Sequence, residues 1–248
     1  MNAKIIWLSV IAVLISFFGG FYLANSLNGT ELAKLRAENE QLKKDVTEKP
    51  QPDGELTLTD DEIRQKIAEA DKNPENISFQ RNLGLALFSY GAMKQNTDLI
   101  TESARLLQRV FASNPKDYDV IVTLGNAFYD VASIKKDSEN FKKAREFYAK
   151  ALEQKPDDSD VRADYGSTFL FAEPNELDKA GAELQRALQL KATNQRALLF
   201  MTQTLLKQNK RDEAAKYHAK LREINPKTPD LAEINAQVLP DASNAGQK

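Results

Sequence analysis

The sequence predicts an all-α protein built from about four stacked helical hairpins, and three observations support that prediction. Helix-forming residues dominate the 248-residue chain, glycine and proline are few, and strand-like alternation is scarce. Small residues recur beside aromatic ones at helical spacing. Helix-ending boundaries recur in phase, each followed two residues later by a residue type that caps helices. The boundaries and their caps are Pro74 and Asn76, Pro115 and Asp117, Pro156 and Asp158, Ala192 and Asn194, Pro226 and Thr228.

The clearest unit, residues 115–156, shows why two helices of a hairpin should pack closely. Gly125 lets the second helix approach the first, small residues face it from the other side, and aromatic residues fill the surrounding space. The packing residues of this unit are Leu124, Gly125, Phe128, Ala144, Phe147, Tyr148, Ala151 and Leu152. The corresponding positions elsewhere are Gly84, Gly166, Ala180, Ala187 and Ala214. One hairpin cannot bury both of its faces, so each needs stacked neighbours.

This order of residues resembles the tetratricopeptide repeat: Leu-Gly-x-x-aromatic, then Ala-x-x-aromatic-aromatic-x-x-Ala, then Pro. The resemblance covers residues 59–239. It implies a right-handed α-solenoid with capping helices, in which the first helices of the units line a concave groove. In this family that groove binds peptides or partner surfaces, so the resemblance implies a scaffold for a protein or peptide partner.

Composition gives no support for an enzyme or for a nucleic-acid partner. Charged residues make up 28 % of the chain and the formal net charge is −2, so no excess of basic residues favours nucleic acid. The absence of cysteine excludes disulfides and thiolate metal sites. His218 is the single histidine, and no phosphate loop, nucleophile motif or metal-ligand set occurs. We therefore expect no catalysis, no cofactor and no metal.

The amino-terminal segment predicts a membrane anchor. Residues 5–24 are almost wholly apolar, and twenty helical residues span about 30 Å, the thickness of a bilayer core. We expect a short tail over residues 1–4 and an uncleaved transmembrane helix over residues 5–27; a cleaved signal peptide is the alternative. Cations that follow the span favour a cytoplasmic domain, whereas Lys4 alone precedes it. Because long domains translocate largely regardless of charge, we expect the inner membrane with the repeats on the extracytoplasmic, periplasmic side.

Residues 30–46 follow as a short coiled-coil or helical stalk, and residues 47–58 as a linker containing Pro50, Pro52 and Gly54. Heptad positions of the stalk and a small-residue stripe in the span both favour a homodimer through residues 12–46. The heptad residues are Leu32, Leu35, Asn39, Leu42 and Val46, and the stripe is Ala12, Ser16, Gly20 and Ala24. A charged monomeric stalk is the alternative.

The repeat domain opens at Thr59 and Glu62, a capping box, with a helix that is the second half of a repeat. Hairpins then follow at about residues 76–113, 117–154, 158–190 and 194–224, a closing helix at 228–239, and a disordered tail at 240–248.

Two of these hairpins differ in length from the last. The first two units have 41 residues between boundaries, seven more than the last unit with 34. Seven residues are about two helical turns, so one extra turn on each helix preserves the pairing. We expect long hairpins with turns near Gln95-Asn96 and Asp137-Ser138; a disordered loop is the alternative.

Two further residues predict local departures from a regular repeat. Pro174 should stop the first helix of the third unit near Phe171 or Ala172. Ser103 stands where the family has alanine, which suggests a looser helix contact in the first unit.

The resemblance also carries over a candidate groove, by repeat position. Its residues are Arg81, Leu85, Phe88, Val122, Asn126, Tyr129, Ala163, Ser167, Leu170, Leu199, Gln203 and Leu206. We expect Asn126 to bond a peptide backbone and Tyr129 to supply contact area. The basic clamp with which some members grip a terminal carboxylate is missing, since acidic and apolar residues such as Asp119 and Val122 stand in such places.

Two functions from different classes follow. The first is a membrane-anchored scaffold whose groove recruits an extracytoplasmic protein. The layout resembles the anchored repeat proteins of bacterial cytochrome c maturation, which present an apocytochrome for haem attachment. The second is a structural assembly protein, in which repeats and stalk build a homo-oligomer without a peptide client.

Overall fold

The computed structural model describes residues 59–227 together with Ile234 and Val238. Among the helices in these residues, none has both the length and the apolar character needed to cross a bilayer. Several predictions concern residues outside the described ones: the tail 1–4, the transmembrane helix 5–27, the stalk 30–46, the linker 47–58, most of the closing helix 228–239 and the tail 240–248.

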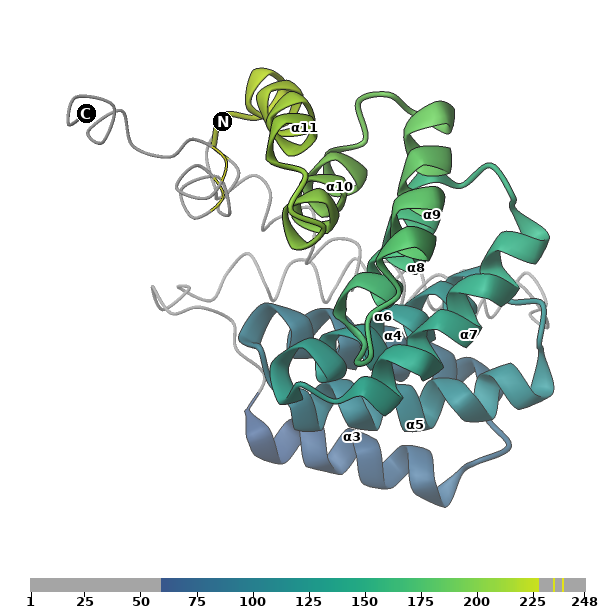
Figure 1. Cartoon of the computed structure of the whole chain (residues 1–248). Helices are drawn as coiled ribbons and strands as arrows, with labels where there is room; N and C mark the ends of the chain where they lie inside the picture. Colours follow the sequence, from purple (N-terminus) through teal and green to yellow (C-terminus); the bar gives the residue numbers. More distant parts are fainter. Residues whose placement is uncertain (1–58, 228–233, 235–237, 239–248) are drawn as a thin grey trace, which may run out of the picture. The chain divides into compact units, whose positions relative to one another are not determined.

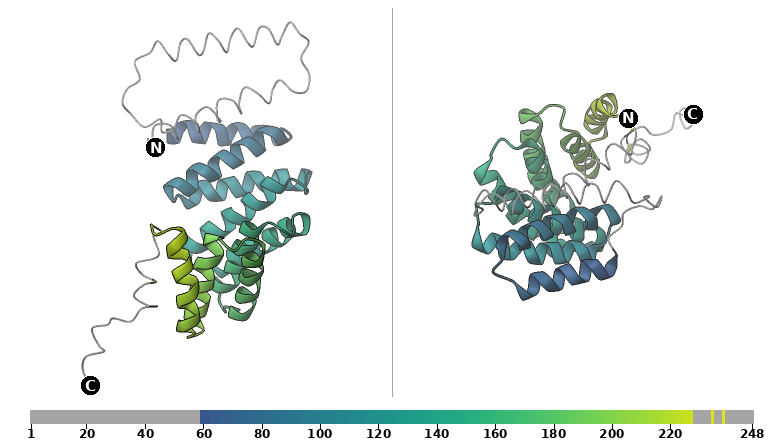
Figure 2. Two further views of the ribbon diagram at one scale, coloured as in Figure 1. Left: turned by 90° about the horizontal axis from the view of Figure 1, so that it is seen from above. Right: turned by 180° about the vertical axis from the view of Figure 1, so that it is seen from behind.

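The described residues form helices and no strand, as the sequence predicted (Figure 1). One single helix is followed by four hairpins, and successive hairpins stack from α3 at one end to α11 at the other (Figure 2). The single helix is α3, Asp60–Lys72. The hairpins are α4 Ile77–Lys94 with α5 Thr97–Ser113, α6 Tyr118–Lys135 with α7 Ser138–Gln154, α8 Ser159–Phe171 with α9 Leu177–Leu190, and α10 Gln195–Lys207 with α11 Arg211–Ile224.

Side-chain caps explain where most helices begin. Thr59 and Glu62 form the predicted capping box, with the Thr59 hydroxyl accepting from the Glu62 amide at 3.2 Å and the Glu62 carboxylate accepting from the Thr59 amide at 2.8 Å. The first helix of every hairpin has the expected cap, whose side chain accepts from a backbone N–H of the first turn. These caps are Asn76, Asp117, Asp158 and Asn194.

The additional residues of the first two hairpins lengthen their helices. The turn between α4 and α5 contains Gln95 and Asn96, and that between α6 and α7 contains Lys136 and Asp137, one residue earlier than expected. Gln95 and Lys136 both adopt the left-handed conformation, at φ 52° and 55°, which reverses the chain within two residues. α8 ends at Phe171, because proline follows three residues later.

Glycines on the inner side of the first three hairpins permit the close approach of their two helices. A Cβ on Gly125 would lie 2.6 Å from the Tyr148 ring, and one on Gly84 would lie 2.7 Å from Leu107. Gly166 faces Leu184 in the same way, at 3.0 Å. The remaining predicted packing residues are buried except Phe128 and Phe147, which are half-buried and stack on each other. The buried ones are Leu124, Ala144, Tyr148, Ala151, Leu152, Ala180, Ala187 and Ala214.

The expectation that Ser103 loosens the first hairpin is wrong. Ser103 is fully buried, and its hydroxyl donates to the carbonyl of Gly84 on the facing helix at 2.7 Å. A serine at this position therefore adds a hydrogen bond across the hairpin instead of opening it, because the glycine opposite leaves its own carbonyl accessible.

The residues that cap α6, α8 and α10, the first helices of their hairpins, also bond each hairpin to the preceding one. Asp117, which caps α6, accepts two hydrogen bonds from Arg81 of α4, at 2.7 and 3.2 Å. Asp158, which caps α8, accepts one from the Tyr118 hydroxyl of α6 at 2.7 Å. Asn194, which caps α10, likewise donates to the first turn of α8. One side chain thus starts a helix and sets its position on the preceding repeat.

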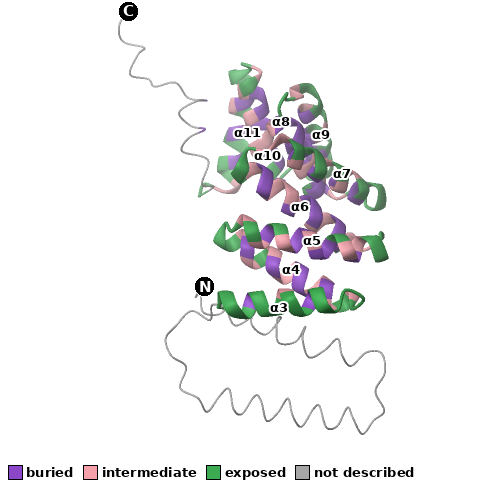
Figure 3. Ribbon diagram, turned by 90° about the horizontal axis from the view of Figure 1, so that it is seen from below, coloured by how far each residue is buried: buried purple, intermediate pink, exposed green. Residues whose placement is uncertain are grey.

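The two ends of the stack differ in how they are covered. α3 is largely exposed, with only Ile63 and Ala70 buried, and it closes the first hairpin with one amphipathic face (Figure 3). At the other end, Ile234 and Val238 are 3 % and 5 % exposed and belong to the apolar cluster of the last two hairpins. Both positions are helical, within the range predicted for the closing helix.

Candidate functional site

The inner helices of the hairpins form one continuous face. α4 contacts α6, α6 contacts α8 and α8 contacts α10, whereas no comparable contact joins the outer helices α5, α7, α9 and α11 to one another in the described residues. A stack whose inner helices touch while its outer helices spread is curved, with the inner helices on the hollow side. We call the solvent-facing surface of α4, α6, α8 and α10 the concave face.

Other helices cover α4 and α6 except along one stripe of each, which turns to the concave face. On α4 this stripe contains half-buried Leu85 and exposed Ser89. On α6 the equivalent positions, 41 residues later, are half-buried Asn126 and Asp130. Residues separated by three, four or seven positions share a helix face, which accounts for the repeated stripe.

The predicted groove residues separate into two sets. Half-buried on the concave face are Arg81, Leu85, Phe88, Val122, Asn126, Tyr129, Leu199, Gln203 and Leu206. The other three, Ala163, Ser167 and Leu170, are fully buried, so their assignment to an open groove is wrong. All three lie on α8, which α10 covers more extensively than other inner helices cover one another.

Several of the half-buried residues already have partners within the domain. Arg81 is held by Asp117 and by Asp119, the latter at 3.1 Å. The Asn126 amide oxygen accepts from the Tyr148 hydroxyl at 2.8 Å. Tyr129 packs edge-to-face on a neighbouring ring, with centroids 5.4 Å apart. The pair expected to contact a partner most directly, Asn126 with Tyr129, is thus engaged in the hairpin.

Two aspartates and an arginine that were not among the predicted groove residues lie on the same face. Asp164 of α8 forms an ion pair with Arg196 of α10, with nitrogen and oxygen 2.5 Å apart, and the Asp164 side chain is only 13 % exposed. Asp130 of α6 interacts electrostatically with both. Asp130 could have been identified from the sequence, because it follows the predicted groove residue Asn126 by four residues and therefore shares its helix face.

Burial perturbs both aspartates. It raises the pKa of Asp130 to about 6, with Arg196 acting in the opposite direction. It also raises the pKa of Asp164 to about 7, although the Arg196 charge lowers it and nearby Asp160 raises it further. A carboxylate whose charged form is disfavoured by desolvation gains from any cation brought close to it.

An aromatic row adjoins the acidic side chains. Tyr129 of α6 contacts Phe171 at the end of α8, with ring centroids 6.4 Å apart, and Phe171 contacts Phe200 of α10 at 5.8 Å. The ammonium group of Lys207 lies 5.9 Å from the centre of the Phe171 ring. The concave face near α8 therefore combines carboxylates with ring surfaces.

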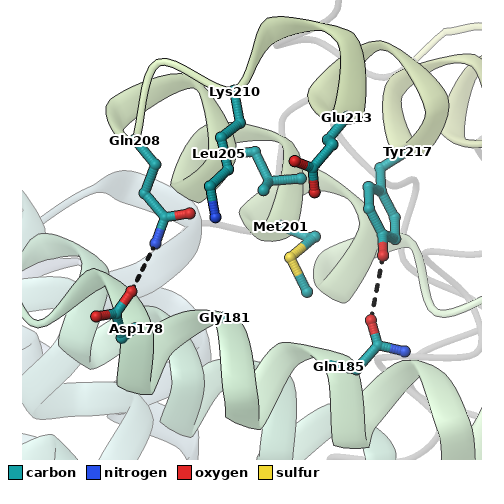
Figure 4. Close-up of a pocket in the computed structure, with 9 residues that line it drawn as sticks. All are labelled: Asp178, Gly181, Gln185, Met201, Leu205, Gln208, Lys210, Glu213 and Tyr217. Carbon is teal, nitrogen blue, oxygen red and sulfur yellow. Dashed lines mark hydrogen bonds between the residues drawn. The ribbon is translucent and has the colours of Figure 1, made fainter.

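A shallow hollow of 250 Å³ lies on another side, between α9 and the last hairpin (Figure 4). Two hydrogen bonds cross it: the Gln208 amide donates to Asp178 at 3.0 Å, and the Tyr217 hydroxyl donates to Gln185 at 3.1 Å. Its floor includes Gly181, above which a Cβ would meet nothing within 4 Å. No group of three histidine or carboxylate residues able to hold a metal ion occurs in the part of the chain that the structure describes.

Comparison with known proteins identifies the fold. A tetratricopeptide repeat family model matches residues 171–238. No curated protein sequence matches the chain significantly. The crystal structure of MamA is 19 % identical, with a TM-score of 0.53, covering 67 % of this chain and 88 % of that one.

Two further solved structures are similar. The thermophilic tetratricopeptide protein TTC0263 of Thermus thermophilus is 20 % identical, with a TM-score of 0.53, covering 72 % of this chain and 89 % of that one. The protein YrrB, described as having an unusual peptide-binding site, is 16 % identical, with a TM-score of 0.53, covering 70 % and 83 %. The helical repeats of this chain therefore have the tetratricopeptide fold.

Proposed function

We propose that this protein is a scaffold that binds a peptide segment of a partner protein on its concave face. The observation that carries the proposal is the set of half-buried side chains, mixed apolar and polar, at the groove positions of α4, α6 and α10, three of the four inner helices. Such a surface suits an extended or helical peptide, which needs apolar contact area as well as polar groups for its backbone. The matching family describes a repeat and not a catalytic domain, and YrrB is a tetratricopeptide protein with a peptide-binding site.

We further propose that the scaffold is anchored in the inner membrane by residues 5–27, with the repeats on the extracytoplasmic side. The support is the almost wholly apolar stretch over residues 5–24, which has no charged residue, and the single lysine that precedes it. Assembly of envelope complexes, including maturation of cytochrome c, is the setting we propose for such a layout. A reporter fused after residue 50 tests the topology: periplasmic reporter activity is expected, and cytoplasmic activity would contradict it.

Site-specific photo-crosslinking of the full chain in its membrane tests the binding face. The photoreactive side chain is placed at Ser89, which is exposed on α4, and separately at half-buried Thr123 of α6, which precedes Asn126 by three residues on the same helix face. Gln108, exposed on outer helix α5, is the matched control. We expect the first two positions to label the same partner protein and the control position to leave it unlabelled.

The other outcomes are equally informative. Labelling of the partner from Gln108 alone would place binding on the outer side and refute the proposal. Adducts between two copies of this chain alone would support the second function, a homo-oligomeric assembly protein without a peptide client.

A further inference from the structure

Asp130 is a half-buried carboxylate for which the described structure provides no donor. It lies in the middle of α6 on the concave face, away from the helix termini where a carboxylate is stabilised by the helix dipole. Within residues 59–227, no hydrogen bond or ion pair reaches its side chain, and only the more distant charge of Arg196 opposes the effect of burial. A carboxylate that is partly removed from water without a partner destabilises the free protein.

Asp164 shows that a carboxylate on this face can bind a cationic group. The Arg196 guanidinium reaches Asp164 while its own side chain stays 59 % exposed, so a cationic group can enter from solvent and pair there. Asp160, at the start of α8, adds a third carboxylate close to the pair. Three carboxylates and one guanidinium leave two negative charges unmatched when all are ionised.

Observations independent of the acidic residues also point to a missing donor. The Gln203 amide oxygen of α10 is buried and accepts no hydrogen bond, and Gln203 lies seven residues from Arg196 on the same helix face. The Phe171 ring already has the Lys207 ammonium near its centre, as a ring surface that attracts cations would. This part of the concave face thus has acceptors and ring surfaces in excess of donors.

We propose that the concave face between α6, α8 and α10 recognises a basic side chain, arginine or lysine, of the bound peptide, with Asp130 as the carboxylate that receives it. This inference rests on the proposed peptide-binding function and specifies the chemistry of the partner. The basic group supplies the donors and the positive charge that Asp130 lacks, and the aromatic row adjoining it offers contact area to the aliphatic stem.

The test uses the purified full-length protein and a pair of fluorescently labelled peptides. One peptide repeats Gly-Ser-Arg, and the other repeats Gly-Ser-citrulline, which keeps the shape of arginine but is neutral. We expect the arginine peptide to bind about tenfold more tightly, as the loss of a charge-assisted hydrogen bond predicts. In the Asp130→Asn variant that preference should fall to about twofold or less, whereas Glu146→Gln, an exposed change on outer helix α7, should retain it.

Equal binding of the two peptides, or an undiminished preference in Asp130→Asn, would overturn the inference. Circular dichroism of both variants checks that they are folded. The crosslinks from Ser89 and Thr123 separate the two proposals. If they persist while arginine and citrulline bind equally, the concave face binds peptides without selecting charge; if they are absent, the proposed function itself is wrong.

Discussion

Replacing Asp130 by asparagine should stabilise the free protein at neutral and alkaline pH. Burial raises the pKa of this carboxyl from 3.8 to about 6. A difference of roughly two units corresponds to about 3 kcal/mol, and screening at a partly exposed position reduces this to about 1–1.5 kcal/mol. Asparagine keeps the size of the side chain and removes the charge, so this amount should appear as a gain in the free energy of unfolding.

The size of this gain in the free energy of unfolding depends on pH in a way that identifies its cause. Because the folded-state pKa is raised, the folded protein binds the proton more tightly than the unfolded chain does. The fold therefore has its full stability below about pH 4, where the Asp130 carboxyl is protonated. Part of that stability is lost as pH rises through about 6, because the carboxyl then ionises in the folded protein. The gain from Asp130→Asn should be full at about pH 8 and nearly absent at about pH 4.

Other groups act on the same site. The charged and titratable side chains facing Asp130 from the elements around it are Asp164 of α8, Arg196 of α10, Tyr148 of α7 and Tyr129 of α6 itself. The two tyrosines stay neutral in this pH range, because burial raises their pKa values. Asp164 is the group whose titration overlaps, with a pKa of about 7.

Thermal unfolding followed by far-ultraviolet circular dichroism measures the effect in the full-length protein. At about pH 8 we expect Asp130→Asn to raise Tm by about 2–5 °C, given the usual conversion for a domain of this size. Glu146→Gln, exposed and without an ion pair in the described structure, should leave Tm unchanged. A lower Tm at pH 8, or an equal gain at both pH values, would refute the claim that Asp130 is a half-buried carboxylate whose charge is not compensated.

The remaining predictions concern packing and the fastening of repeats. Gly125→Ala should destabilise the fold by about 1–3 kcal/mol, because the new methyl carbon would lie 2.6 Å from the ring of buried Tyr148. Gly181→Ala should instead stabilise the fold by about 0.5–1 kcal/mol, since nothing lies within 4 Å of the added Cβ and alanine is the better helix former. Urea unfolding compares the two variants, and effects of the same sign would contradict the packing argument. Tyr118→Phe should cost about 1–2 kcal/mol through loss of the hydrogen bond to the Asp158 cap, and a wild-type urea midpoint would show that this bond does not hold the repeats together.

The periodicity of the repeat was readable because its signals are local. A proline stops a helix, and a capping side chain two residues later starts the next, within one turn of chain. The long hairpins also followed from local geometry, since about two extra turns divided between antiparallel helices keep their inner faces paired. Pro174 stopped α8 at Phe171 for the same reason.

The candidate site was less readable, because it depends on how closely one repeat lies on the next. Ser167 and Leu170 occupy groove positions by register, yet both are fully buried, Leu170 in the apolar cluster that α8 shares with α10. Asn126 also occupies such a position, but the Tyr148 hydroxyl reaches it from the second helix of its own hairpin. Counting residues along one helix does not show how close another helix lies.

By itself, the sequence determined the helices, their caps, the hairpin lengths and the glycines at which paired helices meet, because each of these is decided by residues within about one turn or one hairpin. Only the tertiary structure decided which inner-face residues stay open to a partner and which carboxylates lose water without gaining a donor. Those properties belong to the space between α6, α8 and α10, and burial there raises the pKa of Asp130 and Asp164. Desolvation is a sum over neighbours from several repeats, so it arises only when the repeats are stacked.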